Sequence, residues 1–249
     1  MTPPDSESRR AIPRLFVDAA LAPGADCLLG DNAVRHVQVL RLQPGAALTL
    51  FDGRGGQWQA QIARIGRREV SVKVGAHESV ERESPRAVML AVGMPANERM
   101  DTLIEKATEL GVAAVQPLVC QRSVLRVAGV RAERKAAHWR AVAAAACEQC
   151  GRNRVPPVSA PLPLAEFLAR SDRPSSRWLL SLDASARSPQ RPPRDEALCV
   201  LSGPEGGFTD AEEALALGAG FVPVSLGGRV LRADTAPLAA LAWLAMEDA

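Results

Sequence analysis

Short apolar runs separated by turn residues fill the first part of the chain. Between Pro13 and about Ala76, the runs RLFV, ALTLF, WQAQIARI and EVSVKV alternate with Pro-Gly, Asp-Gly and Gly-Gly pairs. Runs of this kind, rich in β-prone residues and bounded by turn signals, are typical of a small all-β barrel. We therefore predict a β-barrel domain over residues 13–78. The preceding residues 1–12 are polar and rich in proline, and we predict a disordered N-terminus there.

The hydrophobic period changes after residues 79–86, a charged stretch that we predict to be an interdomain linker. Over residues 87–249, AVMLAVG and VAAVQPLV are predicted to be buried strands. Between them we predict a helix from Glu98 to Leu110, with Gly111 as its stop. One face of this helix carries the apolar residues Met100, Leu103, Ile104, Ala107 and Leu110.

Strand and helix patterns continue to alternate in the rest of this domain. An Ala-rich helix is predicted over about Arg131–Cys150, followed by a Pro-rich connection and the strands RWLLSL, ALCVLS and FVPVSL. Thr209 and Glu212 match a capping box, so a helix should begin directly after the SGPEGGF turn. The last helix, about Pro237–Met246, is nearly all apolar and must be buried in the domain or against a partner subunit. Strands separated by helices indicate an α/β domain with a parallel sheet.

The composition is that of a folded protein with balanced charge. Of the 249 residues, 47% are hydrophobic and 23% are charged, and the formal net charge is +2. This balance argues against a surface that is basic all round, although basic residues can gather on one face. Arginine supplies 27 of the 30 basic residues, which suits recognition of phosphates and base edges. The codon bias of a GC-rich genome explains the same excess equally well.

Cysteine usage and the lack of long apolar stretches predict a cytoplasmic, reducing location without membrane association. The chain has five cysteines, an odd number, and neither an apolar leader nor a run long enough to span a membrane. Cys147 and Cys150 form a Cys-x-x-Cys pair, but a zinc site needs four ligands, and no second pair or His cluster accompanies them. We therefore expect structural cysteines and no metal site.

A glycine-rich turn, Gly203-Pro204-Glu205-Gly206-Gly207, follows an apolar strand and precedes the capped helix. This position is the carboxyl edge of a parallel sheet, where α/β proteins bind ligands. Glycines let backbone polar groups approach a flat ligand closely. A phosphate-binding loop would end in Gly-Lys-Ser/Thr, which is absent, so a nucleoside without phosphates fits better. Taken alone, such a turn more often only reverses the chain.

A second glycine-containing loop, LGGRVLRADTA over residues 226–236, also lies between a strand and a helix, so the two loops can enclose one ligand. GPEGGF followed by LGGRVLRADTA resembles the C-terminal signature of the ribosomal RNA small subunit methyltransferase E family, in the SPOUT superfamily. ERMDTLIEKATELGVAAVQPLVCQRSV and WRAVAAAACEQCGRNRVPPV resemble its first helix-strand unit and its central helix. RHVQVLRLQPGAALTLFDGRG resembles its PUA-like N-terminal domain, so the resemblance runs from about Pro13 to Met246.

The resemblance implies a PUA-like β-barrel followed by an α/β domain with a deep trefoil knot, although chains rarely thread themselves. It also implies a homodimer that binds S-adenosylmethionine (SAM) and forms N3-methyluridine in 16S ribosomal RNA of the small ribosomal subunit. The positions that match the cofactor pocket of the family are Gly203, Glu205, Gly206, Leu226, Gly227, Leu231 and Arg232, with Ser181 and Leu182 at the end of the preceding strand.

Methylation of uridine N3 makes one demand on the site, because this nitrogen carries a proton at neutral pH. The site must remove the proton or stabilise the uracil anion. We take Asp234 or Glu205 as the proton acceptor and Arg232 as the stabilising cation. The alternatives are that Asp234 caps the last helix, that Glu205 holds the loop and that Arg232 binds phosphate.

Two short stretches depart from the family pattern. Family members usually have Arg-Thr-Glu-Thr where this chain has RADT over residues 232–235, which shortens the carboxylate arm. They often have a basic residue and Gly where this chain has Ala96-Asn97, in a loop expected to face RNA. Neither departure touches the two glycine clusters.

The target base must leave its stack to reach a cofactor in the pocket, so the enzyme must also hold the surrounding RNA. We expect arginines of the PUA-like domain to bind this RNA. The residues that we assign to RNA binding in this domain are Arg14, Arg35, His36, Arg41 and Arg54, together with Arg64, Arg67 and Arg68. Arg122 and Arg152 are the comparable positions in the second domain. A run of surface arginines is also typical of a solvated face.

Two other functions stay open at this point. The chain can be a knotted methyltransferase for another acceptor, such as a ribose 2′-hydroxyl or a guanine of transfer RNA. It can also be a non-catalytic RNA-binding factor for ribosome assembly that retains the fold. The glycine loops argue against the second function, and the PUA-like domain favours the uridine enzyme over the first.

Overall fold

The computed structural model describes residues 12–96 and 98–246, and the chain divides into two compact units between Arg82 and Glu83. Each unit has a hydrophobic core of its own. The stretch predicted as a linker is partly built into the second unit. Arg86 is buried, and its Nη1 donates hydrogen bonds to the carbonyls of Pro192 and Pro193. None of the described helices is long and apolar enough to cross a bilayer.

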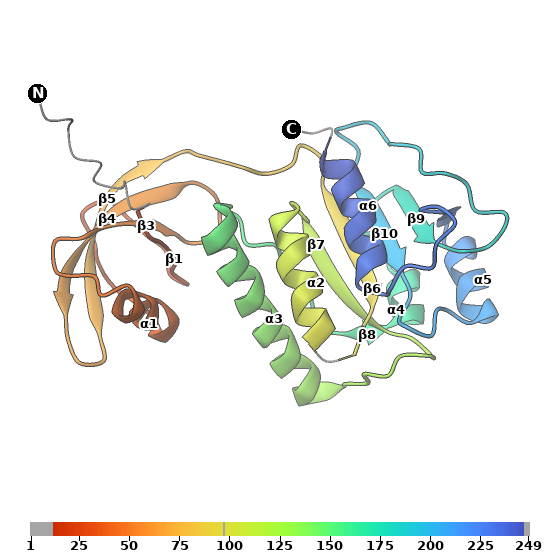
Figure 1. Ribbon diagram of the computed structural model, residues 1–249, viewed down its shortest axis with the longest axis horizontal. Helices are drawn as coiled ribbons and strands as arrows, with labels where there is room; N and C mark the ends of the chain where they lie inside the picture. Colours follow the sequence, from red (N-terminus) through yellow and green to blue (C-terminus); the bar gives the residue numbers. More distant parts are fainter. Residues whose placement is uncertain (1–11, 97, 247–249) are drawn as a thin grey trace, which may run out of the picture. The chain divides into compact units, whose positions relative to one another are not determined.

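The first unit is built on a five-stranded sheet in the order β1-β3-β4-β5-β2; Figure 1 labels β1, β3, β4 and β5. β1 pairs in parallel with β3, and the other strand pairs are antiparallel. Its elements are β1 (Arg14–Phe16), β2 (Asp26–Leu28), α1 (Asp31–Val39), β3 (Ala47–Phe51), β4 (Gln57–Ile65) and β5 (Val70–Glu78). The predicted strand runs therefore all occur, with β2 as an additional edge strand.

The expectation that this unit is all-β is wrong at α1. Ala33, Val34 and Val37 are buried on one face of this helix and belong to the core of the unit. The helix is only nine residues long, and its N-cap residue, Gly30, has no side chain that can cap it. Because neither a capping box nor a long apolar period marks it, the sequence pattern does not separate it from the neighbouring turns.

The second unit contains a six-stranded, fully parallel sheet in the order β11-β9-β10-β6-β7-β8. The predicted parallel α/β sheet is confirmed. In chain order its elements are β6 (Val88–Gly93), α2 (Glu98–Glu109), β7 (Ala114–Val119), α3 (Gly129–Cys150), β8 (Leu162–Pro163), α4 (Leu164–Ala169), β9 (Ser176–Leu180), β10 (Leu198–Ser202), α5 (Asp210–Gly218), β11 (Val222–Val224) and α6 (Thr235–Ala245).

Helices cover both faces of this sheet (Figure 1). Leu103 of α2, Trp139 of α3 and Leu241 of α6 belong to the core on one face. Phe167 of α4 and Ala216 of α5 belong to the core on the other. The apolar last helix is thus buried inside the unit, on the central strands β6 and β10. This arrangement brings the carboxyl ends of β9, β10 and β11 to one edge of the sheet.

Candidate active site

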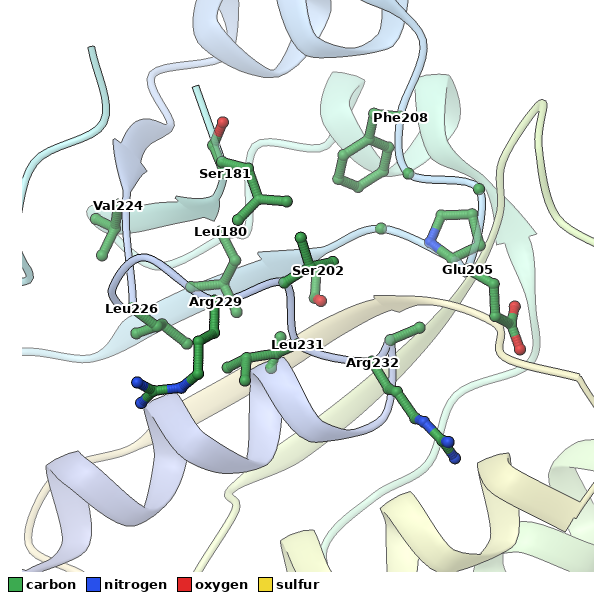
Figure 2. Close-up of a pocket in the computed structure, with 18 of the residues that line it drawn as sticks. Leu180, Ser181, Ser202, Glu205, Phe208, Val224, Leu226, Arg229, Leu231 and Arg232 are labelled. Carbon is green, nitrogen blue, oxygen red and sulfur yellow. The ribbon is translucent and has the colours of Figure 1, made fainter. Parts of the chain in front are cut away.

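Three segments at the carboxyl edge of the sheet enclose a cleft of about 540 Å³ (Figure 2). They are residues 181–182 after β9, the glycine-rich turn 203–207 after β10, and the 225–234 loop after β11. Parallel strands end at a common edge, so three connections that are distant in sequence meet here. All the positions expected to bind cofactor line this cleft: Ser181, Leu182, Gly203, Glu205, Gly206, Leu226, Gly227, Leu231 and Arg232.

The glycine-rich turn is held by hydrogen bonds on two sides. The N–H of Gly207, which has a φ of +67°, donates to the carbonyl of Pro204 at 2.8 Å. The Nη1 of Arg122 donates to the carbonyls of Gly206 at 3.1 Å and Phe208 at 2.9 Å. Arg122, which we expected to contact RNA, therefore has a structural role at the cleft that its sequence position does not reveal.

The helix after this turn begins with the predicted capping box. Thr209 Oγ1 accepts a hydrogen bond from the Glu212 N–H at 3.3 Å, and Glu212 Oε2 accepts one from the Thr209 N–H at 2.9 Å. The second carboxylate oxygen of Glu212 accepts from the N–H of Gln121 at 2.8 Å. Glu212 therefore fixes the start of α5 and also joins it to the segment that follows β7.

The 225–234 loop contains one position, Gly227, with a backbone conformation that only glycine adopts easily. Gly227 has a φ of +108°, and its N–H donates to Ser225 Oγ at 3.3 Å. At the end of the loop, the Arg232 carbonyl accepts hydrogen bonds from the N–H groups of Thr235 and Ala236, both at 2.9 Å. The loop is thereby tied to the first turn of α6.

Gly227 and Gly228 offer a matched pair of substitutions. A Cβ on either residue would meet no atom within 4 Å, but only Gly227 has a positive φ. We expect Gly227→Ala to weaken binding of SAM about tenfold, because strain of about 1–2 kcal/mol would shift the loop. Gly228→Ala should leave affinity within about twofold of the wild type, since it adds no comparable strain. Calorimetry measures the affinity of both variants for SAM. Equal affinities would contradict the assignment of the Gly227 loop to SAM binding.

The cleft has an apolar part and a polar part (Figure 2). Leu180, Val224, Leu226 and Leu231 gather on one side of it, whereas Glu205 lies on the other. A planar, weakly polar ring fits the apolar part, because burying it removes apolar surface from water. The polar part suits the charged portion of a ligand.

Glu205 is engaged by the loop that follows β6. Its Oε1 accepts a hydrogen bond from the Ala96 N–H at 2.9 Å and lies 3.8 Å from Arg99 Nη1. These contacts favour the interpretation that Glu205 holds the loop over its interpretation as proton acceptor. Asn97, the other residue of the Ala96-Asn97 departure, lies outside the described residues.

The side chains of Asp234 and Arg232 differ from that of Glu205, because they make no hydrogen bond or ion pair with the described residues. Asp234 occupies the N-cap position of α6, but its side chain makes no capping hydrogen bond. Its Oδ1 is buried and has no hydrogen-bond donor among the described residues. Asp234 does not itself line the cleft, whereas the two preceding residues, Arg232 and Ala233, do. The interpretation of Asp234 as a simple helix cap is therefore wrong, and its carboxylate has an unfilled acceptor position.

Several residues of the cleft wall were not anticipated. Leu180, Ser202 and Val224 end the three strands, Phe208 follows the glycine-rich turn, and Arg229 lies in the 225–234 loop. The strand ends have a signal in the sequence, since the last residue of a strand leads into each predicted loop. Arg229 points away from the apolar part of the cleft (Figure 2).

The Cys147–Cys150 pair lies outside the cleft. Both residues have free thiols, and Cys147 is buried with its Sγ 3.5 Å from the carbonyl of Arg154, to which it donates. In the part of the chain that the structure describes, no group of three or more His, Cys, Asp or Glu side chains is placed to hold a metal ion.

The arginines assigned to RNA in the first unit differ in their exposure. Arg14 is half-buried: its Nη1 donates to Gln57 Oε1 at 2.6 Å, and its guanidinium lies 4.9 Å from the centroid of the Phe51 ring. Arg64 pairs with Glu69 at 2.5 Å. The other exposed members of the set are Arg35 on α1, Arg41 and Arg54 in loops, and Arg67 and Arg68 in the β4–β5 turn; Arg64 is exposed as well, and His36 on α1 is half-buried.

The assignment of Arg152 to RNA binding is wrong. Arg152 is only 4% exposed, its guanidinium forms a two-pronged ion pair with Glu83, and its Nη1 donates to the carbonyl of Thr108 at 2.9 Å. A buried arginine requires such partners, because its five donors lose their water. The sequence shows the charge of Arg152 but not this burial.

Removal of Arg152 should therefore affect stability and not RNA. We expect Arg152→Met to lower the free energy of unfolding by about 2–3 kcal/mol, because Glu83 and the Thr108 carbonyl lose their partner. Arg134→Met, at an exposed position of α3, is the control and should change stability by less than about 0.5 kcal/mol. Urea unfolding measures both, and a stable Arg152→Met variant with weakened RNA binding would restore the original assignment.

Comparison with known proteins agrees with this geometry. Residues 82–245 match the family model of an RNA methyltransferase domain, and residues 29–75 match that of an RNA methyltransferase PUA domain. The fold and the cleft are thus those of an RNA methyltransferase.

Ribosomal RNA small subunit methyltransferase E of Synechocystis sp. is 37% identical over 215 residues, which are 83% of this chain and 68% of the relative. The protein of that name from Mycobacterium bovis is 32% identical over 91% of this chain and 88% of its own. This chain belongs to the ribosomal RNA small subunit methyltransferase E family.

Solved structures are similar over almost the whole chain. A methyltransferase of Legionella pneumophila in complex with SAM superposes with a TM-score of 0.88 and 35% identity, covering 95% of this chain and 98% of the other. Ribosomal RNA small subunit methyltransferase E of Neisseria gonorrhoeae bound to SAM gives 0.87 and 36%, with coverages of 94% and 96%.

Proposed function

We propose that this chain transfers the methyl group of SAM to N3 of a uridine in 16S ribosomal RNA of the small subunit. The observation that carries the proposal is the cleft of about 540 Å³ between two glycine-containing loops at the carboxyl edge of the parallel sheet. Membership of the ribosomal RNA small subunit methyltransferase E family supports the substrate. The similar structures from Legionella and Neisseria hold SAM, which supports the cofactor.

The residues of the cleft fit SAM. Adenine would lie in the apolar part, against Leu180, Leu226 and Leu231. Gly203 and Gly227 have no Cβ, so the ribose and the base edge can come close to their backbone N–H and C=O groups. SAM carries no phosphate, which agrees with loops that lack a phosphate-binding lysine.

Two side chains are assigned to the acceptor base. SAM, when bound, would supply an electrophilic methyl group: a bond from uridine N3 to the methyl carbon would form as the methyl–sulfur bond breaks, S-adenosylhomocysteine would leave, and the N3 proton would have to be removed. We assign this proton to Asp234, which directly follows the cleft-lining Ala233; its buried Oδ1 has no donor among the described residues, and the other carboxylate oxygen, Oδ2, would receive the proton. Arg232, whose side chain makes no ion pair or hydrogen bond with them, stabilises the negative charge on the uracil oxygens. Glu205 is a positioning residue for the loop after β6.

Binding of RNA requires more than the cleft. The target base must leave its stack to reach a cofactor held by loops. We assign the grip to the PUA-like unit, whose exposed Arg35, Arg41 and Arg54 can contact phosphates without reading sequence. Arg122 adds a charge beside the glycine-rich turn.

We also infer a trefoil knot and a homodimer, as in the SPOUT superfamily. The support for the knot is that α6 packs on the central strands although the preceding strand, β11, lies at the edge of the sheet. The support for the dimer is that Leu182 and Val230, 64% and 81% exposed, lie beside the cleft, where a second copy would cover them. A cytoplasmic location follows from the proposed substrate.

Transfer of a labelled methyl group from SAM to small ribosomal subunits that lack native modification tests the proposal. Nucleoside mass spectrometry should then find N3-methyluridine in the 16S RNA. A methylated ribose, or labelled guanine in transfer RNA, would show a different acceptor. Binding of SAM without transfer to any RNA would reject this substrate, and absence of SAM binding would favour a non-catalytic assembly factor.

A further inference from the structure

A carboxylate without a partner lies on the α5 side of the cleft. Glu213 lines the cleft from the first turn of α5, directly after the capping-box residue Glu212. Its backbone N–H donates to the carbonyl of Thr209 at 2.9 Å. Its side chain is half-buried and makes no hydrogen bond or ion pair with the described residues. The capping-box pattern explains Glu212 but gives Glu213 no role.

The other carboxylate of the cleft wall is already in use. Among the residues that line the cleft, Glu205 and Glu213 are the acidic ones, and Glu205 accepts from the Ala96 N–H and lies near Arg99. Glu205 therefore already has two partners within the protein. None of the described residues pairs with the Glu213 side chain, and its place near the N-terminus of α5 favours the negative charge. A ligand with a cationic donor would complete this site.

SAM, on the function proposed above, brings one such donor. Its amino-acid end carries an ammonium group with three N–H donors, which lose water when the ligand enters a cleft and must find acceptors. Its sulfonium carries charge but no N–H donor. With adenine against Leu180 and Leu226, we place the amino-acid end toward Phe208, which lies across from Leu226 in Figure 2, and toward Glu213 of the same cleft wall. Glu213 is the uncompensated acceptor on that side.

We propose that Glu213 binds the ammonium group of SAM and selects ligands that have an intact amino-acid end. The inference rests on the proposed function, because it assumes that SAM is the ligand of the cleft. It adds a specificity-determining residue on α5 to the two glycine-containing loops. The carboxylate takes no part in proton transfer, so it should affect the affinity for the cofactor and not the chemical step.

Three ligands separate this role from other roles. SAM has both the sulfonium and the ammonium, S-adenosylhomocysteine has only the ammonium, and 5′-methylthioadenosine has neither. In the full chain, Glu213→Gln should weaken SAM and S-adenosylhomocysteine by about tenfold or more, as expected for loss of a charge-assisted hydrogen bond. Binding of 5′-methylthioadenosine should stay within about twofold. The KM for SAM should rise while kcat at saturating SAM stays unchanged.

Asp210→Asn is the matched control. Asp210 lies in the same first turn of α5 and is exposed, but it does not line the cleft. This variant removes the same charge from the helix N-terminus and should leave all three affinities unchanged. Calorimetry or fluorescence titration provides the dissociation constants.

The outcomes are distinct. Unchanged SAM affinity in Glu213→Gln would overturn the inference, and so would an equal loss for 5′-methylthioadenosine, which has no ammonium group. A loss confined to SAM would also overturn it, because the carboxylate would then act on the sulfonium. Failure of the wild-type chain to bind SAM would instead reject the proposed function itself.

Discussion

Gly93→Ala is expected to weaken SAM binding about a hundredfold, although Gly93 does not line the cleft. Gly93 is the last residue of β6, next to β10 in the sheet. A Cβ at this position would lie 2.5 Å from both the Cδ and the backbone N of Pro204, and 3.0 Å from the carbonyl carbon of Gly203. Two of these three atoms belong to the backbone, so the glycine-rich turn must move to make room. A misplacement of about an ångström can cost about two orders of magnitude in catalytic rate, and we expect a shift of the glycine-rich turn to affect SAM binding to a similar degree.

The same variant should lose only moderate stability. Inserting one methyl group into a packed position costs about 1–3 kcal/mol, and a turn at the sheet edge can relax part of this strain. Gly218→Ala, at the end of α5 with open space around its Cβ, is the control and should leave both stability and affinity unchanged. Calorimetric titration with SAM and thermal unfolding measure the two effects. Normal affinity in a folded Gly93→Ala variant would show that the cleft does not depend on this close approach.

The case of Gly93 shows what sequence reasoning reaches and what it misses. Local signals placed most strands and helices correctly, because an apolar strand or the Thr209–Glu212 capping box is defined by residues close in sequence, but the short elements β2, β8 and α4 were missed. The short helix α1 escaped, since nine residues with a glycine at the N-cap carry little local signal. Contacts across the sheet, such as Gly93 against Pro204, depend on which strands become neighbours.

The same distinction holds within the site. Glycine-containing loops after strands are local motifs, and both line the cleft as expected. The partners of single charged residues are not local. Arg152 is paired with Glu83, 69 residues away, and Glu205 accepts from Ala96, 109 residues away. Sequence position therefore made Arg152 a candidate for RNA and Glu205 a candidate for catalysis, although the fold supplies each with a partner.

Asp234→Asn is expected to reduce methyl transfer at saturating SAM by at least about a hundredfold, the usual contribution of a positioned proton acceptor. The carboxamide keeps the shape of the carboxylate but cannot take the N3 proton at neutral pH. It can direct its oxygen to the buried Oδ1 position, so that no N–H donor is left without an acceptor there. The affinity for SAM should stay within about twofold, because Asp234 does not line the cleft.

Stability separates catalysis from a role in starting α6. The Asp234 side chain makes no capping hydrogen bond, so Asp234→Asn should leave the midpoint of thermal unfolding unchanged. Asp234→Ser, which retains a side chain able to cap a helix, should be as inactive as Asp234→Asn and as stable as the wild type.

Single-turnover methylation of small ribosomal subunits at several pH values provides the rate. Full activity of the Asn variant would eliminate Asp234 as the acceptor. A raised pH that rescues wild-type and variant rates in parallel would assign deprotonation of uridine to solvent, because the uracil anion then forms without the help of the protein.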